Sequence, residues 1–474
     1  MKTVTAHDLA ETYDLVVVGA GPAGLSAAAT AADHGVTVLL VDENASIGGQ
    51  FYRAITTTPV EAPGLLGPDF WKGRPLAQRI AAAPVSYLPK AAVWNIVAPT
   101  GPAAGFEIGV SGGGAARVIL AHQCILATGA LERPFPVPGW TLPGVMTAGA
   151  AQTLLKESGL VPSGRTVLVG TGPLVYALAE KLAAAGAPPL AVLDTTIGAN
   201  WSAALPWLPE FLISRFAVKG LRLLAALRRC TRVISGVSEV ALDGTGQGVE
   251  RIRFRRHGGA EETLAVDYAL LHQGVIPNIA LSCVAGCSHD WDPLQLCWFP
   301  TTDATFQSSV GGLAIAGDGA GIGGAESALI AGEIAAIGAI GRLGFVAADI
   351  CDGLIAGKRR QWSRSLRGRR FIDHLYQPGR QFRIPANPST IVCRCEEVTA
   401  GQIRRAVVEG GIGPNQVKAF LRSGMGPCQG RLCGQTVTEL IAEARGVTPA
   451  DVGYFHLRPP VKPVTLAELA ALKR

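Results

Sequence analysis

Apolar positions near the start of the chain form short runs separated by a glycine-rich turn and an alanine-rich stretch. Leu15–Val18 is too short for a helix and predicts a buried strand. The alanine-rich stretch that follows predicts a helix, and Val36–Val41 predicts a returning strand. A strand, a helix and a second strand in this order are typical of a parallel βαβ unit, so we expect an α/β fold.

Glycines occupy the turn before this helix at the spacing Gly-x-Gly-x-x-Gly. Gly19 permits the tight turn, Gly21 lets a pyrophosphate approach the backbone, and Gly24 lets the helix pack close to the strand. Asp42 ends the second strand about 20 residues further on, where a carboxylate can accept hydrogen bonds from ribose hydroxyls. The pattern predicts an adenine dinucleotide site rather than a glycine turn without a ligand. Its predicted residues are Gly19, Ala20, Gly21, Pro22, Ala23, Gly24, Asp42 and Glu43.

Three further stretches indicate which dinucleotide binds there. Gly48–Gln50 follows the second strand, Ile125–Gly129 reads ILATG, and Gly312–Gly324 reads GLAIAGDGAGIGG. Together with His272–Asn278 (HQGVIPN), they resemble the motifs of two-dinucleotide-domain flavoproteins related to glutathione reductase. The resemblance implies FAD in the first site, with the late Gly-Asp pair on the ribityl chain and pyrophosphate. The residues implied to lie beside FAD are Gly49, Gln50, Ala127, Thr128, Gly129, Gly317 and Asp318.

An altered copy of the glycine pattern lies in the middle of the chain. Thr166–Val169 predicts its strand, Gly170 and Gly172 form the turn, and Val175 replaces the third glycine. A branched side chain there pushes the helix away from its strand, which disfavours ordinary NAD(P)H binding. Asp194 ends the next predicted strand and would repel a 2′-phosphate, so NADH suits this site better than NADP. We expect a vestigial or repurposed nucleotide site, with NADH binding as the alternative.

The composition sets bounds on the protein class. A chain of 474 residues has room for about three domains. Its 48% apolar and 16% charged residues are typical of packed α/β layers. The net charge of +6 is mild, and no nucleic-acid-binding module is visible, so we expect no nucleic-acid partner. We find no secretory signal and no apolar run long enough to span a membrane, which predicts a cytoplasmic protein. Peripheral membrane association through a partner stays open.

Cysteine usage argues against one class of flavoprotein. The chain has 10 cysteines, and six of them are scattered and expected to be small buried hydrophobic residues. Disulfide-reducing flavoproteins carry a close cysteine pair beside the flavin, yet Phe51–Arg53 follows Gln50 here and no such pair is present. We therefore expect no thiol-disulfide reductase. The scattered cysteines are Cys124, Cys230, Cys283, Cys287, Cys297 and Cys351.

The other four cysteines lie close together near the C-terminus. Cys393 and Cys395 form Cys-x-Cys, and Cys428 and Cys433 form Cys-x-x-x-x-Cys within GMGPCQGRLCG. Four thiolates in two close pairs suit a [2Fe-2S] cluster or a tetrahedral zinc ion. The pattern resembles the helical [2Fe-2S] domain of the bacterioferritin-associated ferredoxin type, and an iron-sulfur cluster would give flavin electrons a destination. Gly424, Gly426 and Gly430 would let the backbone wrap around the cluster.

The predicted order of domains follows from these motifs. A discontinuous FAD domain surrounds the altered nucleotide domain, and a linker leads to the [2Fe-2S] domain and an extended tail. The predicted bounds are 1–145 with 280–350, then 146–279, 351–384, 385–445 and 446–474.

Two stretches allow both a packing role and a binding role. Trp201, Trp207 and Phe211 lie close together and are either packing aromatics or part of a partner surface. Lys358–Arg370 (KRRQWSRSLRGRR) is a dense basic run, and it is either a solvated helix or linker or a binding patch. Leu221–Arg229 suits an amphipathic helix.

The full set of motifs resembles the FAD-binding alpha subunit (A-subunit) of opine oxidases, hydrogen cyanide synthase and multi-subunit proline or hydroxyproline dehydrogenases. The resemblance rests on the FAD motifs, the altered second turn with Val175, the missing redox disulfide, GMGPCQGRLCG and the tail RPPVKPVTLAELA. It implies an electron-transfer subunit whose D-amino-acid-oxidase-like FAD partner oxidises a C–N bond of an amino acid, imino acid or opine. It also implies a small [2Fe-2S] subunit in some complexes, FMN at a subunit interface, and ATP or ADP in the second nucleotide site.

No catalytic side chain is predicted, because the histidines lie in unrelated contexts without an evident base or nucleophile. Three hypotheses remain open: a subunit of an amine-oxidising complex, a stand-alone NADH-dependent flavin and iron-sulfur reductase, and a regulator or scaffold. The histidines considered are His34, His122, His272, His289 and His374.

Overall fold

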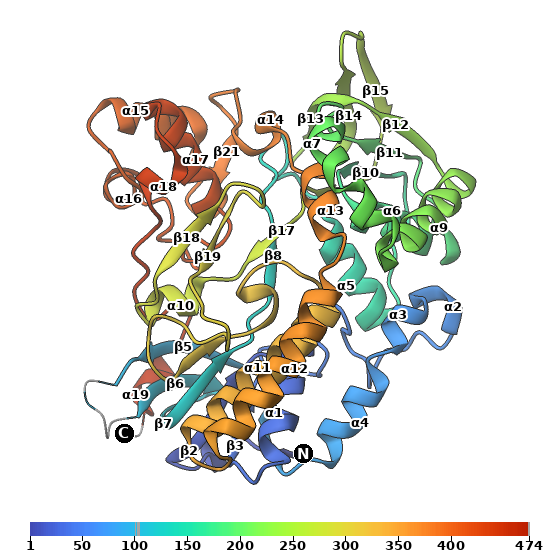
Figure 1. The fold of residues 1–474 in the computed structure, drawn as a ribbon. Coiled ribbons are helices and arrows are strands. Elements are labelled where there is room, and N and C mark those ends of the chain that lie inside the picture. Colours follow the sequence, from blue (N-terminus) through green and yellow to red (C-terminus); the bar gives the residue numbers. More distant parts are fainter. Residues whose placement is uncertain (100, 102–104, 473–474) are drawn as a thin grey trace.

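The computed structural model describes residues 1–99, 101 and 105–472. It contains two large sheets with their covering helices and a C-terminal helical module (Figure 1). In the described part of the chain, no helix is long and apolar enough to cross a membrane.

An eight-stranded sheet forms the lower part of the molecule in Figure 1. Its main path runs β1-β4-β3-β2-β7-β6-β5, and β20 pairs in parallel with β7. β2, β3, β7 and β20 are parallel, so their carboxyl ends meet at one edge, where ligands bind in such sheets. The strands are β1 (Lys2–Thr3), β2 (Thr12–Val18), β3 (Val38–Val41), β4 (Val85–Leu88), β5 (Ala91–Val97), β6 (Phe106–Gly112), β7 (Ala115–Leu126) and β20 (Leu313–Ile315).

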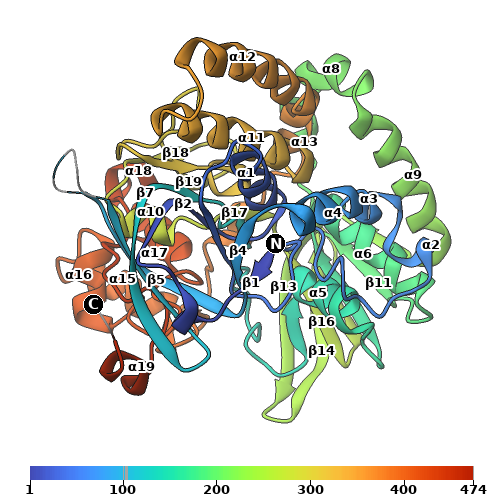
Figure 2. The ribbon, with the colours of Figure 1, turned by 90° about the horizontal axis from the view of Figure 1, so that it is seen from below.

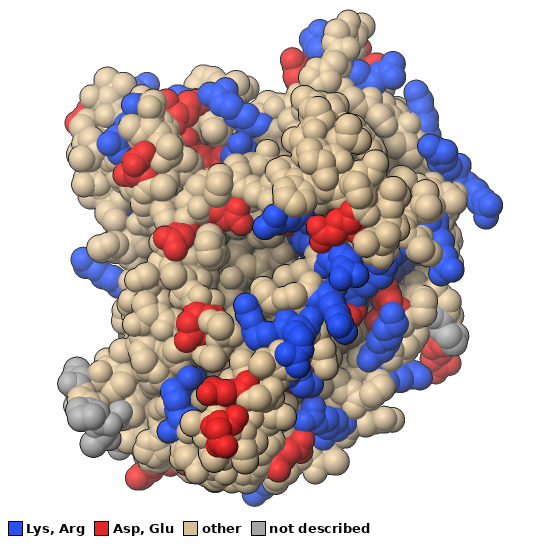
Figure 3. Space-filling view, in the orientation of Figure 1, with Lys and Arg blue, Asp and Glu red and all other residues tan. Residues whose placement is uncertain are grey.

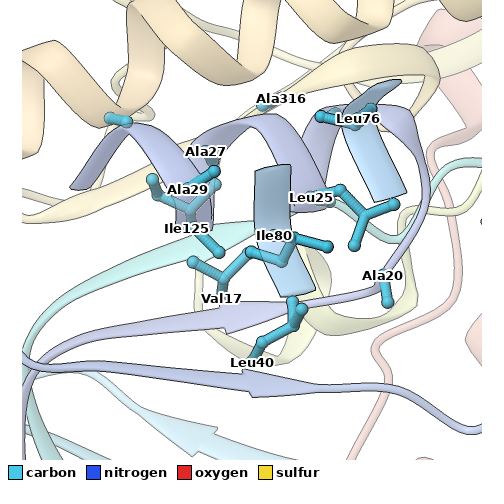
Figure 4. Close-up of a cluster of buried hydrophobic side chains, with 14 of the residues drawn as sticks. Val17, Ala20, Leu25, Ala27, Ala29, Leu40, Leu76, Ile80, Ile125 and Ala316 are labelled. Atoms are coloured by element: carbon cyan, nitrogen blue, oxygen red, sulfur yellow. The ribbon is translucent and has the colours of Figure 1, made fainter. Parts of the chain in front are cut away.

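Two small-residue helices cover one face of this sheet. α1 (Pro22–Ala32) connects β2 to β3, and α11 (Ala325–Arg342) packs directly on it. A Cβ atom on Gly332 would lie 2.1 Å from the carbonyl oxygen of Ala23, so the two helices approach almost backbone to backbone. Figure 4 shows side chains from β2, β3 and β7 meeting those of α1 and α4 (Arg74–Ala82) in the buried core. Alanine and glycine permit this close packing because they leave no bulk between the helices.

A second parallel sheet lies at the upper right of Figure 1, in the order β12-β11-β10-β16-β9. An antiparallel ribbon of β13, β14 and β15 extends beyond it. The strands are β9 (Val145–Thr147), β10 (Thr166–Gly170), β11 (Ala191–Asp194), β12 (Arg232–Ser235), β13 (Val237–Thr245), β14 (Gly248–Arg256), β15 (Glu261–Ala265) and β16 (Tyr268–His272). The helices of this part are α5 (Ala148–Ser158), α6 (Pro173–Ala184), α7 (Asn200–Ala204), α8 (Leu208–Leu212) and α9 (Arg215–Cys230).

Shorter elements connect the two sheets and the surface. β8 pairs with β17, β18 pairs with β19, and 3₁₀ turns follow β1, α7 and β20. These elements are β8 (Ala130–Glu132), β17 (Val275–Pro277), β18 (His289–Asp292), β19 (Cys297–Pro300), α2 (Pro63–Leu66), α3 (Pro68–Trp71), α10 (Ala280–Val284), and the 3₁₀ turns Ala6–Asp8, Leu205–Trp207 and Gly317–Gly319.

The basic run lies in two helices, α12 (Ala348–Ser365) and α13 (Arg369–Leu375). α12 packs on α11, and α13 packs on the aromatic side chains near α7 and α8. Phe211 stacks on Phe371 with ring centroids 4.3 Å apart, and Trp207 stacks on His374 at 6.1 Å. The packing interpretation of Trp207 and Phe211 is therefore confirmed. Trp201 keeps an exposed side chain.

The C-terminal module has a core of its own. Val417, Val437 and Leu440 are fully buried there, and Gly434–Arg445 forms its most buried helix, α17. Figure 2 shows the module beside the edge of the first sheet. Its other elements are β21 (Ile391–Cys393), β22 (Val398–Thr399), α15 (Ala400–Val408), α16 (Pro414–Leu421) and α18 (Pro449–Val452), and α14 (Arg380–Arg383) precedes it.

The tail returns to the first sheet. The amide of Val461 donates to the carbonyl of Trp94 at 3.0 Å, and Val461 is fully buried. Two short helices, α18 and α19 (Leu466–Ala470), interrupt the stretch that was expected to be extended throughout. Their threonine N-caps explain the difference, because a capping box stabilises a single helical turn.

Most predicted elements lie within a few residues of the observed ones. The strand expected at Val36–Val41 begins at Val38, and the amphipathic helix expected at Leu221–Arg229 is the longer α9. Both sheets and the C-terminal module take their strands and helices from the predicted segments. The domain bounds themselves stay a prediction.

Candidate functional site: two dinucleotide turns and a cysteine module

Each glycine of the first turn has its own steric role. Gly19 has a φ of +107°, and a Cβ there would lie 2.4 Å from the carbonyl oxygen of Ala127. A Cβ on Gly24 would lie 1.7 Å from the carbonyl oxygen of Gly19, so only glycine lets α1 approach the turn. Gly21 differs, because its Cβ would find no protein atom closer than the Cα of Gly49 at 3.7 Å. The missing side chain of Gly21 therefore leaves room for a ligand.

Asp42 lies at the end of β3, beside the first turn. Its Oδ2 accepts a hydrogen bond from the amide of Ala20, and its Oδ1 accepts from the amide and side chain of Asn44, both at 2.7 Å. Burial raises the pKa of Asp42. A carboxylate has about four lone-pair sites, so one stays free for a ribose hydroxyl. Glu43 is half exposed and pairs with Lys462 of the tail.

The remaining FAD-site candidates converge on the same edge of the sheet. A Cβ on Gly317 would lie 2.8 Å from the Cβ of Ala23, and one on Gly319 would lie 3.4 Å from the hydroxyl of Thr128. Asp318 accepts hydrogen bonds on Oδ1 from the amides of Gly323 at 2.9 Å and Gly324 at 2.8 Å. The structure thus brings together segments that lie far apart in sequence. They comprise Gly19–Gly24, Asp42, Gly49, Ala127, Thr128, Gly129, Gly317 and Asp318.

These residues fit an FAD molecule. The open space at Gly21, the amino end of α1 and the carboxylate of Asp42 match the pyrophosphate and ribose of an adenine dinucleotide. Gln50 is held by the second sheet's helix α5, because Lys156 donates to its carbonyl at 3.0 Å. Burial lowers the pKa of Lys156 well below its usual value.

The second turn keeps its glycine backbone but is covered by tyrosines. Gly172 has a φ of +99°, and Val175 is fully buried in α6. Tyr176 donates its hydroxyl to Asp194 at 2.9 Å. The ring of Tyr376, which follows α13, lies 6.3 Å from the ring of Tyr176, and its Cβ is 4.0 Å from where a Cβ on Gly172 would be. The linker therefore lies over both the turn and its acidic strand end.

Asn200 holds this linker in place. Its side-chain amide donates to the carbonyls of Leu375 at 3.1 Å and Gln377 at 2.9 Å. Tyr376 lies between these two anchored positions. The covering of the second turn is thus fixed by hydrogen bonds as well as by ring contacts.

A buried histidine and carboxylate pair lies between the two nucleotide parts and was missed from sequence. Nδ1 of His272 lies 2.6 Å from Oε1 of Glu132, whose Oε2 accepts from the amide of Gly149 at 2.9 Å. The expectation that His272 has no nearby base was wrong, because β8 and β16 come together only in the fold. His289 likewise has a partner, with Nε2 2.8 Å from the hydroxyl of Ser282. The sequence signal was present in Glu132, which directly follows the ILATG motif.

The four C-terminal cysteines gather into two pairs. The thiol of Cys433 hydrogen-bonds to Cys393, which together with backbone amides lowers the pKa of Cys393 to about 6. Cys395 hydrogen-bonds to Cys428. Cys393 and Cys433 are buried, whereas Cys395 is exposed. All 10 cysteines are free thiols, and four of the six scattered ones are buried as expected.

Three glycines let the loop close around these thiols. A Cβ on Gly426 would lie 2.3 Å from the Cβ of Cys395, so a side chain there would push the cysteine out. Gly424 and Gly430 both lie under Phe455, and a Cβ on either would come within 2.8 Å of its ring. The donor set is four sulfurs in two pairs, which fits the two irons of a [2Fe-2S] cluster. No three His, Cys, Asp or Glu side chains in the described residues are arranged as a single-ion site.

A buried polar network joins the cysteine module to the flavoprotein part. Gln435 of α17 donates to the carbonyl of Leu296 at 3.0 Å and to Glu439 at 2.9 Å. Arg133 is buried and donates to the same Leu296 carbonyl at 2.8 Å. Arg383, just before the module, forms an ion pair with Glu439, and burial lowers the pKa of Arg383 to about 10. The module is therefore anchored by hydrogen bonds on both sides of one helix.

Replacing Glu439 by Ala should loosen the module. The change leaves Arg383 buried without its carboxylate, and loss of one partner of a buried ion pair costs about 3–5 kcal/mol. We expect faster proteolysis between residues 384 and 390 with unchanged flavin absorbance. Glu239→Ala is the matched control, because its ion pair with Arg255 is exposed and contributes about 0–1 kcal/mol. Equal protease resistance of both variants would contradict this anchoring role.

Comparisons with known proteins agree with this geometry. Residues 13–335 match the pyridine nucleotide-disulphide oxidoreductase family, and residues 391–443 match the BFD-like [2Fe-2S] binding domain. The opine oxidase A-subunit of Agrobacterium tumefaciens (strain Ach5) is 48% identical over 98% of this chain and 93% of its own length. The chain belongs to the family of opine oxidase A-subunits.

Members of this family and one solved structure extend the comparison. Hydrogen cyanide synthase subunit HcnB of Pseudomonas protegens (strain DSM 19095 / LMG 27888 / CFBP 6595 / CHA0) is 30% identical over 95% of this chain and 96% of its own. The L-proline dehydrogenase structure from P. horikoshii covers 99% of this chain and 80% of that chain, with a TM-score of 0.70 and 18% identity. At that identity the match shows the fold alone.

The family assignment confirms several predictions. The chain is an α/β oxidoreductase with a two-dinucleotide-domain fold and a C-terminal [2Fe-2S] binding domain. FAD and a [2Fe-2S] cluster are the cofactors that these matches support. Relatives are named as subunits, so the family forms multi-subunit enzymes.

Proposed function

We propose that this chain is the electron-transfer subunit of a multi-subunit dehydrogenase or oxidase, whose partner subunit oxidises a C–N bond of an amino acid, imino acid or opine. The observation that carries the proposal is the [2Fe-2S] module anchored on the flavoprotein part through Gln435, Glu439 and Arg383. The names of the relatives, opine oxidase and hydrogen cyanide synthase subunits, supply the substrate class.

The chain's own residues would bind and orient both cofactors. Gly21, Asp42 and Asp318 would hold FAD, and Cys393, Cys395, Cys428 and Cys433 would hold the cluster. FAD accepts two electrons as a hydride, and a [2Fe-2S] cluster carries one electron at a time. The anchoring network would keep the two sites at a constant separation. No side chain here is assigned to substrate deprotonation, because that step belongs to the partner.

The partners follow from the same resemblance. We propose that the oxidising partner is a D-amino-acid-oxidase-like FAD subunit, that a small [2Fe-2S] subunit joins the complex, and that FMN lies at a subunit interface. ATP or ADP is proposed for the second nucleotide site, supported by the φ of +99° at Gly172 and by the amino end of α6. We propose a cytoplasmic location for the complex.

NADH should not reduce the flavin of this chain. Tyr376 lies against Gly172 and Tyr176, and Tyr176 already binds Asp194, so a nicotinamide dinucleotide would have to displace the linker. An anaerobic visible spectrum before and after NADH addition tests this, and we expect the flavin bands to stay unbleached. Rapid bleaching would favour the stand-alone NADH-dependent reductase instead. A Tyr376→Ala variant that alone gains bleaching would assign the exclusion to this tyrosine.

The complex is tested by purification from the native host. We expect the chain to co-purify with a second flavoprotein, and an amino acid, imino acid or opine to bleach the flavin only in that complex. A chain that always purifies alone, and is reduced by NADH, would contradict the proposed function. Substrate screening then identifies the donor.

A further inference from the structure

Exposed aliphatic side chains concentrate on α8 and α9. Leu212, Ile213, Val218, Leu221 and Leu224 have exposed fractions of 60%, 74%, 55%, 70% and 40%. These five residues define the α8–α9 surface. Single exposed apolar residues are common, but a contiguous group marks an interaction site. The α8–α9 surface has no role in either cofactor site.

The spacing along α9 explains why so many apolar residues face outward. Ala217, Leu223 and Leu227 are buried and hold the helix on the domain. Val218 and Leu221 lie three positions apart and therefore share one face of the helix, turned away from the buried one. α9 is thus apolar on two faces, although the domain needs only one of them. Stability of the domain does not account for the outer face.

Arginines flank this outer face. Arg222, Arg228 and Arg229 have no ion-pair partner among the described residues, whereas Arg215 pairs with Glu326 and Lys219 with Asp69. The sequence from residue 200 to residue 235 contains a single acidic residue, Glu210. Glu210 is half-buried and accepts a hydrogen bond from the amide of Gly368, so it does not offset the exposed charge. The face carries charge of one sign.

The basic run extends the cationic surface. Arg360, Arg364 and Arg367 are exposed and have no ion-pair partner in the part of the chain that the structure describes. Gly368 lies against Ser214 and Phe211, which places this end of α12 next to α8. Figure 2 shows α12, α8 and α9 along one rim of the molecule, and Figure 3 shows Lys and Arg gathered over α12 and α13. The two acidic residues of α12, Asp349 and Asp352, lie at its opposite end.

We propose that the α8–α9 surface and the arginines of α12 dock the protein on an anionic phospholipid surface. A surface helix with aliphatic side chains on one face and arginines on its flanks is suited to the membrane interface. Clustered arginines near a negatively charged leaflet add an electrostatic attraction. A protein interface would more often mix both signs of charge around its apolar centre. The absence of balancing acids among the described residues of this face therefore favours lipid over a protein partner.

Vesicle flotation tests the proposal on the purified full chain. The probes are vesicles of phosphatidylcholine alone and of phosphatidylcholine mixed with phosphatidylglycerol. We expect the chain to float with the mixed vesicles at low salt, to be released at high salt, and to ignore the neutral vesicles. High salt screens the arginines but leaves the apolar contacts intact.

Two sets of variants separate the apolar and the charged contributions. Leu221→Glu should weaken binding about tenfold or more, because it places a charge in the apolar strip. The triple change of Arg222, Arg228 and Arg229 to Gln should weaken it on the order of 100-fold, at about fivefold per arginine. Val408→Glu and Arg405→Gln are matched controls on α15, where Val408 is 87% exposed, and should bind like the unmodified chain.

Several outcomes would overturn the proposal. They are equal binding to neutral and mixed vesicles, no binding to either, and loss of binding in the α15 controls to the same extent. Dissociation of a partner subunit by Leu221→Glu, without a change in flotation, would assign the face to a protein interface. Folding does not confound the test, since Leu221 is 70% exposed, and flavin absorbance with thermal unfolding verifies each variant.

Discussion

Replacing Cys428 by Ser should abolish the iron-sulfur signal and leave the flavin bound. A [2Fe-2S] cluster needs four thiolate ligands, and Cys428 is one of the four that lie in close pairs. The module has its own buried core, so FAD binding in the first sheet should not depend on the cluster. Electron paramagnetic resonance of the reduced protein measures the cluster, and visible absorbance measures the flavin. We expect complete loss of the first and about full retention of the second.

A matched cysteine change serves as the control. Cys230→Ser lies at the end of α9, far along the chain from the four candidate ligands, and should keep both signals. Loss of flavin together with the cluster in Cys428→Ser would show that the two parts do not fold independently. Retention of the cluster would mean that another residue provides the fourth ligand.

Replacing Gly21 by Val should remove FAD from a chain that still folds. Gly21 has φ and ψ of −79° and −176°, which any residue can adopt, and its Cβ would clear protein atoms by 3.7 Å. The added side chain would fill the space meant for the pyrophosphate. An overlap of this kind costs about 1–3 kcal/mol, which weakens FAD binding roughly tenfold to hundredfold. Flavin content and circular dichroism of the purified variant measure the two effects.

The neighbouring glycine gives the contrasting result. Gly24→Ala places a Cβ 1.7 Å from the carbonyl oxygen of Gly19, so α1 must move and the fold itself should weaken. Gly353→Ala is the neutral control, because nothing lies within 4 Å of its Cβ in α12. A Gly21→Val variant that unfolds like Gly24→Ala would contradict the separation of a ligand role from a packing role.

Much of the fold could be predicted because its signals are local. The run Leu15–Val18 and the glycine spacing after it specify a strand and a turn through residues that are neighbours in sequence. Alanine-rich helices predict close packing, and α1 and α11 do pack backbone to backbone. The tail was predicted less well, since capping boxes of single helical turns were not weighed.

The second nucleotide part could be predicted only in outline. Val175 signalled an altered site, and it is fully buried without disrupting the sheet. The linker residue Tyr376 could not be connected with Gly172 from sequence, since some 200 residues separate them and no periodic pattern links the two. Contact between such segments depends on how α13 packs on α7 and α8.

The amino-acid sequence by itself determined the chemistry that is available to this protein. Glycine positions, the acidic strand end at Asp42 and four paired cysteines restrict the cofactors through residue type and spacing alone. Only the tertiary structure decided which distant groups meet. Glu132 reaches His272, Arg383 reaches Glu439, and the tail reaches the first sheet because buried polar groups must find partners wherever the packing brings them. Such pairings follow from the whole fold rather than from any local pattern.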